Sequence, residues 1–138
     1  MKKFIITEKS SVMKDFIRIL DPSAKSVCYE KPYVYYYEGK DYVFACANGH
    51  LFEVKSPDEI NTDFKKWTSN IMRFPDPLPL KTIQRAKGYF KCIQDILKNQ
   101  GKNIDEVIVI TDPDREGQLI WALIERNLTC LLYTSRCV

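Results

Sequence analysis

The sequence predicts an α/β domain built on a mainly parallel sheet flanked by helices, with an inserted β-hairpin and a long loop. Short apolar strands alternate with amphipathic helices along the chain, which is the pattern of that fold class. The run Val107-Ile108-Val109-Ile110 is continuous and β-branched, as in a central parallel strand covered on both faces. A length of 138 residues fits one domain.

The first half of the chain is expected to form a strand, a helix and then more β-structure. Lys3–Ile6 has the composition of a short buried strand. Ser11–Leu20 is predicted to be a helix because its apolar residues recur at three- and four-residue spacing on one face. These apolar residues are Val12, Met13, Phe16, Ile17 and Leu20. Val27–Tyr29 is β-prone, and Tyr33–Tyr37 and Tyr42–Ala47 flank a turn, which predicts a hairpin.

The second half is expected to be a long loop followed by two helices around the central strand. Ser56–Leu80 is predicted to be irregular, with one helical turn near Asp58–Ile60, because its prolines exclude a long helix. These prolines are Pro57, Pro75, Pro77 and Pro79. Lys81–Asn99 is predicted to be a helix with one apolar stripe. Thr111–Asp114 is expected to be a tight turn, and Glu116–Arg126 a second helix.

The composition excludes several classes of protein. Hydrophobic residues make up 45% of the chain and charged residues 28%, which is globular composition. No apolar run approaches the ~18–20 residues of a membrane span, and Glu8 and Lys9 interrupt the N-terminal apolar run too early for a signal peptide. We therefore expect a cytoplasmic protein without a membrane partner. Five cysteines without a C-x-x-C pair indicate neither a zinc site nor a disulfide framework.

The charge is unevenly distributed along the chain. Residues 55–102 contain ten Lys/Arg and five Asp/Glu, whereas residues 103–138 contain three and six. Lys65, Lys66 and Arg85 belong to the basic part and are candidates for binding single-stranded DNA. Aromatic residues lie among the basic ones, as in a groove that follows a nucleic-acid strand, namely Trp67, Phe74 and Tyr89. An ordinary solvated face remains the alternative.

An acidic cluster follows the predicted central strand. Thr111–Gly117 contains three carboxylates, and Asp112 and Asp114 point the same way if the stretch is extended. Ligands bind at this carboxyl edge of an α/β sheet, and hard oxygen ligands with open positions suit Mg²⁺. Arg115 can offset the charge or hold a phosphate. The alternative is a capped helix start, with Asp114 as the N-cap and Glu116 in the first turn.

A further carboxylate follows the first predicted strand. In a parallel sheet, Glu8 would lie at the same edge as Asp112 and Asp114, with Lys9 beside it. The alternative is a solvated Glu-Lys loop without function.

These residues together resemble the toprim domain of type IA DNA topoisomerases, a Rossmann-like fold. Three motifs of that family are matched in order and spacing. They are Ile5-Ile6-Thr7-Glu8-Lys9-Ser10, Gly49-His50-Leu51 and Thr111-Asp112-Pro113-Asp114-Arg115-Glu116-Gly117-Gln118. Thr7-Glu8-Lys9 and Gln118 look more like the topoisomerase III branch.

The resemblance implies an enzyme that cleaves single-stranded DNA, passes a strand and rejoins the break. It implies Mg²⁺ as cofactor, held by Asp112 and Asp114 with help from Glu116. Glu8 would be the general acid/base, while Lys9 would stabilise charge on the scissile phosphate with Arg115 nearby. His50 matches a motif but receives no role.

The chain also departs from the family. No tyrosine lies in a segment resembling the family's nucleophile motif, which belongs to a later domain around the DNA gate. Residues 129–138 do not resemble the family, and we interpret them as a foreign tail after a C-terminally truncated toprim domain at residues 1–128. The expected protein is therefore an N-terminal fragment, inactive alone, whose partners are DNA and the missing gate domains. The alternatives are a stand-alone toprim nuclease or primase-like protein, or a non-catalytic module that binds single-stranded DNA.

Overall fold

A computed structural model describes residues 1–30, 34–66 and 77–132 of the chain. The strands are β1 Lys2–Thr7, β2 Lys25–Glu30, β3 Val34–Glu38, β4 Tyr42–Cys46, β5 Phe52–Val54, β6 Leu80–Thr82 and β7 Ile104–Ile110. The α-helices are α1 Ser10–Leu20, α2 Pro57–Ile60, α3 Lys87–Gln100 and α4 Arg115–Leu132. None of the helices in these described ranges is long and apolar enough to cross a membrane.

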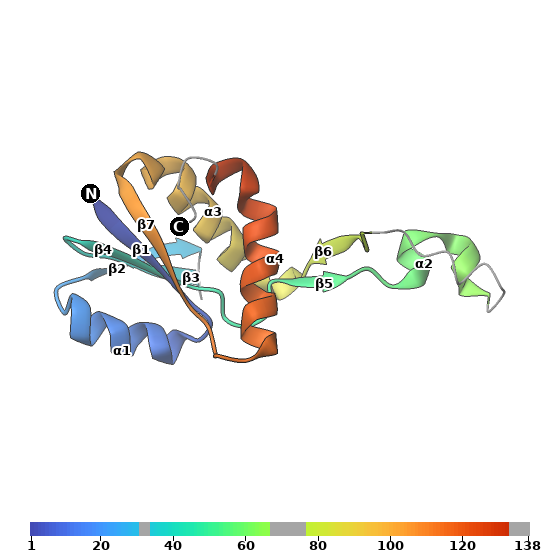
Figure 1. The fold of residues 1–138 in the computed structure, drawn as a ribbon, viewed down its shortest axis with the longest axis horizontal. Coiled ribbons are helices and arrows are strands. Elements are labelled where there is room, and N and C mark those ends of the chain that lie inside the picture. Colours follow the sequence, from blue (N-terminus) through green and yellow to red (C-terminus); the bar gives the residue numbers. More distant parts are fainter. Residues whose placement is uncertain (31–33, 67–76, 133–138) are drawn as a thin grey trace.

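The main sheet has the order β2-β3-β4-β1-β7, which confirms the predicted α/β fold class (Figure 1). β1 pairs in parallel with β4 on one side and with β7 on the other. β3 is antiparallel to both β4 and β2, so the predicted hairpin is confirmed. Thr7, the last residue of β1, lies opposite Cys46 of β4 and Ile110 of β7. Three strands therefore end at the same edge of the sheet.

Helices cover both faces of this sheet (Figure 1). On one face, Met13 and Ile17 of α1 pack with Ile5 and Phe44 in one buried cluster. On the other face, α3 and α4 supply apolar side chains to a larger cluster around β1 and β4. That cluster includes Phe4, Ile6, Val43, Ala45, Ile93, Ile96, Leu97, Ile120, Ile124 and Leu128. Removing this apolar surface from water is the main term that holds the layers together.

The prediction of a central position for the last strand is wrong, although its two covered faces are confirmed. Val107 packs against the larger cluster, while Ile108 and Ile110 pack against the α1 cluster. Within the described residues, however, β7 pairs only with β1 and lies at one end of the strand order. A continuous β-branched run indicates that both faces of a strand are covered, because residue type follows side-chain burial. Such a run does not predict whether the strand has a neighbour on one edge or on both.

The predicted long loop is in part an arm, defined here as residues 52–66 and 77–82. β5 and β6 pair in antiparallel register, from Phe52 with Thr82 to Val54 with Leu80, and lead outward to α2 (Figure 1). The helical turn expected near Asp58–Ile60 is confirmed as α2. The helix predicted from residue 81 is wrong in its first six residues, which form β6 and a 3-10 turn before α3 starts. The backbone of β6 pairs with β5, and helical periodicity in the sequence cannot detect this long-range pairing.

An ion-pair network links β5, β6 and α2 within the arm. Lys81 Nζ lies 2.8 Å from Glu59 Oε2 and 3.4 Å from Glu53 Oε1. Glu59 also accepts from the Ser56 backbone N–H at 2.8 Å, as the acidic member of a capping box. Lys81 and Ser56 together lower the pKa of Glu59 to about 2.

The arm should loosen in acid. The pKa of Glu59 is lower in the folded arm than its ordinary value of 4.5, so its contribution is present above pH 4.5. That contribution is lost as the pH falls toward 2. Amide hydrogen exchange of residues 52–60 should therefore become faster below pH 4 relative to exchange in β1. In Glu59→Gln, the arm should exchange equally fast at about pH 3 and at neutral pH after correction for intrinsic rates. Retention of the acid-induced difference in that variant would contradict this prediction.

Candidate functional site

The carboxyl ends of β1, β4 and β7 bring segments together that are distant in sequence. Glu8 follows β1, and its backbone N–H donates to the Ile110 carbonyl at 3.1 Å. Its own carbonyl accepts from Gly49 N–H at 3.1 Å. Gly49 has φ +93°, a left-handed conformation that favours glycine. Glu8 is thus fixed by its backbone between the ends of the two neighbouring strands.

The predicted proximity of Glu8 and Asp112 is confirmed. The backbone N–H of Asp112 donates to Glu8 Oε2 at 3.2 Å, although 104 positions separate them in sequence. The Glu8 side chain is only 14% exposed, whereas that of Asp112 is 44% exposed. One carboxylate is therefore held within the fold, while the other faces solvent beside it.

Lys9 bridges the two carboxylates. Its Nζ lies 2.5 Å from Asp112 Oδ2 and 3.7 Å from Glu8 Oε1. The hydrogen bond and the charge of Asp112 raise the pKa of Lys9, so the side chain stays an ammonium at neutral pH. The positive charge that two close carboxylates require is therefore supplied by the chain itself.

Asp114 caps the last helix, as the capping alternative predicts. Its Oδ1 accepts from Gly117 N–H at 2.7 Å, and its carbonyl accepts from Gln118 N–H at 3.1 Å at the start of α4. Its Oδ2 makes no such bond within the described residues. The capping role therefore leaves one oxygen of Asp114 available for a ligand.

Gly117 is a structural requirement of this site that the sequence analysis did not single out. A Cβ at this position would lie 2.1 Å from the Asp112 carbonyl oxygen and 2.9 Å from the Asp112 nitrogen. Both are backbone atoms, which cannot rotate away. The glycine lets the start of α4 lie directly against the residue that carries the solvent-facing carboxylate. The glycine at the end of the acidic motif was the feature of the sequence that could have indicated this close approach of two backbone segments.

The remaining residues of the acidic motif are open to solvent. Arg115 and Glu116 are exposed in the first turn of α4, and neither has a side-chain partner among the residues described. Both lie next to Asp114 in the chain and are free to meet a ligand. Glu116 also lies near the positive end of the helix dipole, which favours its charge.

The donor set at this edge fits Mg²⁺. Asp112 Oδ and Asp114 Oδ2 are hard oxygens, and Mg²⁺ in proteins is held by one or two carboxylates while it keeps several waters. The described residues contain no group of three or more His, Cys, Asp or Glu side chains arranged around one point. The residues present thus suit an open site with few protein ligands and not a closed cage.

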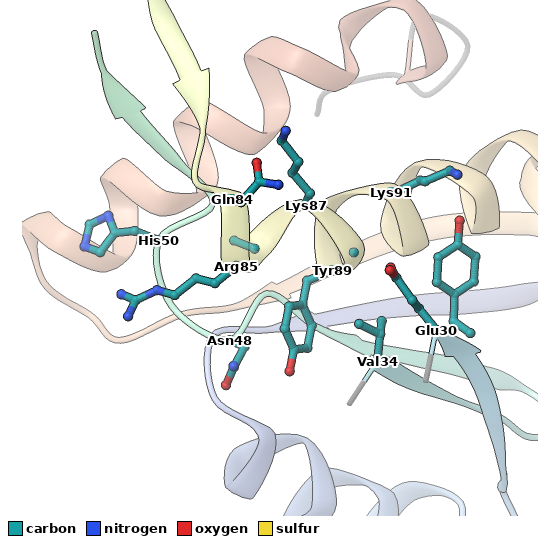
Figure 2. A pocket seen from close by; sticks show the side chains of 12 residues that line it. Glu30, Val34, Asn48, His50, Gln84, Arg85, Lys87, Tyr89 and Lys91 are labelled. Atoms are coloured by element: carbon teal, nitrogen blue, oxygen red, sulfur yellow. The ribbon is translucent and has the colours of Figure 1, made fainter. Parts of the chain in front are cut away.

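A basic cleft of about 1190 Å³ lies beside this edge (Figure 2). His50 and Asn48 come from the loop that contacts Glu8, while Arg85, Lys87 and Lys91 come from the start of α3 and the turn before it. In Figure 2 the Arg85 side chain extends toward the loop that carries His50 and Asn48. Figure 2 also shows Tyr89 between Asn48 and α3. The lining carries the cations Arg85, Lys87 and Lys91, one carboxylate from Glu30, and aromatic and amide groups. Cations interleaved with aromatic groups are the chemistry that phosphates and bases meet in single-strand sites.

The structure separates the three predicted DNA-binding residues. Arg85 lines the cleft, whereas Lys65 ends the 3-10 turn that follows α2 in the arm, and Lys66 comes directly after it. Trp67 and Phe74 lie outside the described residues, and Tyr89 lines the cleft. Lys87 and Lys91 belong to the same basic segment of the sequence, and both line the cleft with Arg85. No described carboxylate lies within ion-pair distance of Arg85, Lys87 or Lys91.

Comparisons with known proteins agree with this geometry. The Toprim domain family matches residues 3–136. The chain is 32% identical over 125 residues to DNA topoisomerase 3 of Staphylococcus epidermidis, which covers 90% of the chain and 16% of that protein. It is 32% identical to DNA topoisomerase 3 of Bacillus thuringiensis (strain Al Hakam) over 120 residues, 86% of the chain and 15% of that protein. It is 28% identical to DNA topoisomerase 3 of Bacillus subtilis (strain 168) over 130 residues, 92% of the chain and 17% of that protein. The chain thus spans about a sixth of the length of these relatives.

Proposed function

Because this chain belongs to the Toprim domain family, we propose that it is the metal-binding part of a DNA topoisomerase related to bacterial DNA topoisomerase 3. The observation that carries the proposal is the hydrogen bond from Asp112 N–H to Glu8 Oε2. It joins the first and last motifs into one acidic site at the sheet edge where α/β folds bind ligands. The substrate is a phosphodiester of single-stranded DNA, and the cytoplasmic location of the whole enzyme remains a prediction.

Each site residue has a role that its position supports. Asp112 and Asp114 hold Mg²⁺, with Glu116 available from the first turn of α4. Glu8 is the general acid/base, because it is fixed by its backbone beside the open edge. Lys9 and Arg115 stabilise charge on the scissile phosphate. When bound, Mg²⁺ supplies further positive charge at the phosphate oxygens.

The nucleophile must come from another part of the enzyme. No tyrosine of this chain lies in a sequence motif recognisable as that of the nucleophile. A phosphodiester held by the site residues therefore has no partner in this chain for a covalent phosphotyrosine link. We expect the chain alone to relax no supercoiled plasmid and to form no covalent adduct with labelled single-stranded DNA. A covalent band that disappears on changing one tyrosine to Phe would contradict this expectation. Nicking without relaxation would favour the stand-alone nuclease instead.

A chimaera tests the proposed function directly. The matching N-terminal segment of the Staphylococcus epidermidis DNA topoisomerase 3 is replaced by residues 1–128 of this chain. The chimaera should relax negatively supercoiled plasmid in the presence of Mg²⁺. Its Glu8→Gln version should lose that activity while it keeps the same Tm. A folded chimaera without activity would contradict the proposal.

The basic cleft is the proposed seat of the DNA segment that leads to the acidic site. The Asn48–His50 loop lines the cleft and also contacts Glu8, so a strand in the cleft would continue toward the carboxylates. Arg85→Ala/Lys87→Ala should weaken binding of a labelled oligothymidine about tenfold at low salt. It should also lower the slope of log Kd against log[salt] by about 1 to 2, because two phosphate contacts are lost. Fluorescence anisotropy at several salt concentrations measures both quantities.

Two control variants have the same change in net charge. Lys98 and Lys102 lie in the last turn of α3 and just beyond it, away from the cleft lining. Lys98→Ala/Lys102→Ala should bind DNA nearly as the parent does. Lys65→Ala/Lys66→Ala, in the arm, tests separately whether these two lysines bind single-stranded DNA. Equal losses in the cleft variant and the Lys98/Lys102 variant would indicate a general charge effect and no specific seat.

A further inference from the structure

Lys9 is the cation that contacts Asp112 in this structure. Its Nζ is 2.5 Å from Asp112 Oδ2, and it also lies 3.7 Å from Glu8 Oε1. No other described cation lies within ion-pair distance of either carboxylate. An ammonium and a hydrated Mg²⁺ cannot share the same face of Asp112, because both carry positive charge and contact the same oxygens.

The Lys9 side chain can leave this position while its backbone stays fixed. The Lys9 carbonyl accepts from Met13 N–H at 3.1 Å, in the first turn of α1, and from Thr7 Oγ1 at 3.1 Å. The side chain is 53% exposed, so water reaches its length. Four methylenes connect this anchored backbone to the ammonium, and their rotation is enough to release Asp112.

We propose that Lys9 is an exchangeable placeholder for the divalent cation. Its ammonium neutralises Asp112 and Glu8 when no metal is bound, and it is displaced when Mg²⁺ binds Asp112. The same step frees the ammonium to meet a phosphate, so metal binding prepares the lysine for the substrate. This inference rests on the proposed function and adds a second role for Lys9, which sets the affinity of the site for the metal.

Competition predicts the direction of the effect. If Lys9 must leave Asp112 before Mg²⁺ binds, removing its charge should tighten metal binding. If Lys9 did not compete with the metal, removing its charge would weaken Mg²⁺ binding or leave it unchanged. Exposed ion pairs contribute little, so the expected decrease in the Kd for Mg²⁺ is roughly two- to fivefold at low ionic strength. The difference should shrink as NaCl is added, because salt screens the charges.

The chain offers a matched control. Lys3 Nζ lies 2.9 Å from Glu106 Oε2, with side-chain exposures of 49% and 53%, close to the 53% and 44% of Lys9 and Asp112. Lys3 is near the start of β1, at the opposite end of that strand from Glu8. Lys9→Met and Lys3→Met each remove one charge and keep most of the aliphatic stem. They differ in whether the lost charge touches the acidic site.

Calorimetric titration with MgCl₂ of the full chain and both variants tests the inference. Lys9→Met should bind Mg²⁺ more tightly than the parent, and Lys3→Met should bind as the parent does. In the parent, NMR signals of the Lys9 ε-methylene should move toward those of solvent-exposed lysines as Mg²⁺ is added, while those of Lys3 stay in place. An unchanged or weaker affinity for Mg²⁺ in Lys9→Met would contradict the exchange of Lys9 for the metal, without contradicting the metal site. A parent chain that binds no Mg²⁺ would overturn the metal site itself.

Discussion

The rise in Tm that Mg²⁺ produces in the parent chain should disappear in Asp112→Asn/Asp114→Asn. A ligand that binds only the folded state stabilises it by about 2.7 kcal/mol at a concentration of 100 times its Kd. For a domain of this size, that corresponds to a rise in Tm of roughly 8 °C. The double variant loses both carboxylates that face the open edge, and with them the reason for a cation to bind. Thermal unfolding with and without 10 mM MgCl₂ measures the difference.

The double variant is designed to keep the fold. Asparagine caps helices about as well as aspartate, so the bond from Gly117 N–H to residue 114 should survive. Asp58→Asn/Asp105→Asn is the matched control, because it removes the same charge at exposed positions away from the sheet edge. The control should keep the full response to Mg²⁺. An undiminished response in Asp112→Asn/Asp114→Asn would place the metal elsewhere.

Gly117→Ala should destabilise the chain by about 3 kcal/mol or more, a fall in Tm of roughly 10 °C. The added methyl group would lie 2.1 Å from the Asp112 carbonyl oxygen, which belongs to the backbone. The start of α4 must therefore move away from β7, and the turn that carries Asp112 and Asp114 must move with it. The response to Mg²⁺ should fall together with the stability.

Gly101→Ala provides the control for the same chemical change. No heavy atom lies within 4 Å of a Cβ at Gly101, and its φ of −54° suits alanine. This variant should be as stable as the parent or slightly more so, because alanine restricts the unfolded chain. A Gly117→Ala variant with parental Tm and parental response to Mg²⁺ would show that α4 shifts without cost. The close approach would then have no bearing on the site.

Local sequence patterns predicted most helices and strands of this protein. Ser11–Leu20 differs from α1 by one residue, because apolar spacing along a helix is a local property. The acidic residues of the motif were also identified from the sequence alone. The sequence left open whether Asp114 caps a helix or holds a metal, and the structure shows the cap with one oxygen to spare. The capping interpretation is therefore confirmed, and metal binding by the spare oxygen of Asp114 stays a prediction.

Patterns that depend on distant partners were predicted less well. No strand was predicted at β5, and β6 was divided between the predicted loop and the predicted helix, because each strand is three residues long and pairs only with the other. The position of β7 was wrong because the neighbours of a strand depend on topology. Arg85 was grouped with Lys65 and Lys66 by charge, yet the arm carries those lysines away from the cleft.

By itself the sequence identified the candidate site residues, since residue types and their spacing in a motif are fixed by the chain. Only the tertiary structure decided how they meet. The parallel register of β1 with β4 and β7 brings Glu8 beside Asp112 and the Asn48–His50 loop. The flexible side chain of Lys9 then lies on Asp112 because the two carboxylates need a cation between them. That contact depends on strands far apart in sequence, so no local pattern could have predicted it.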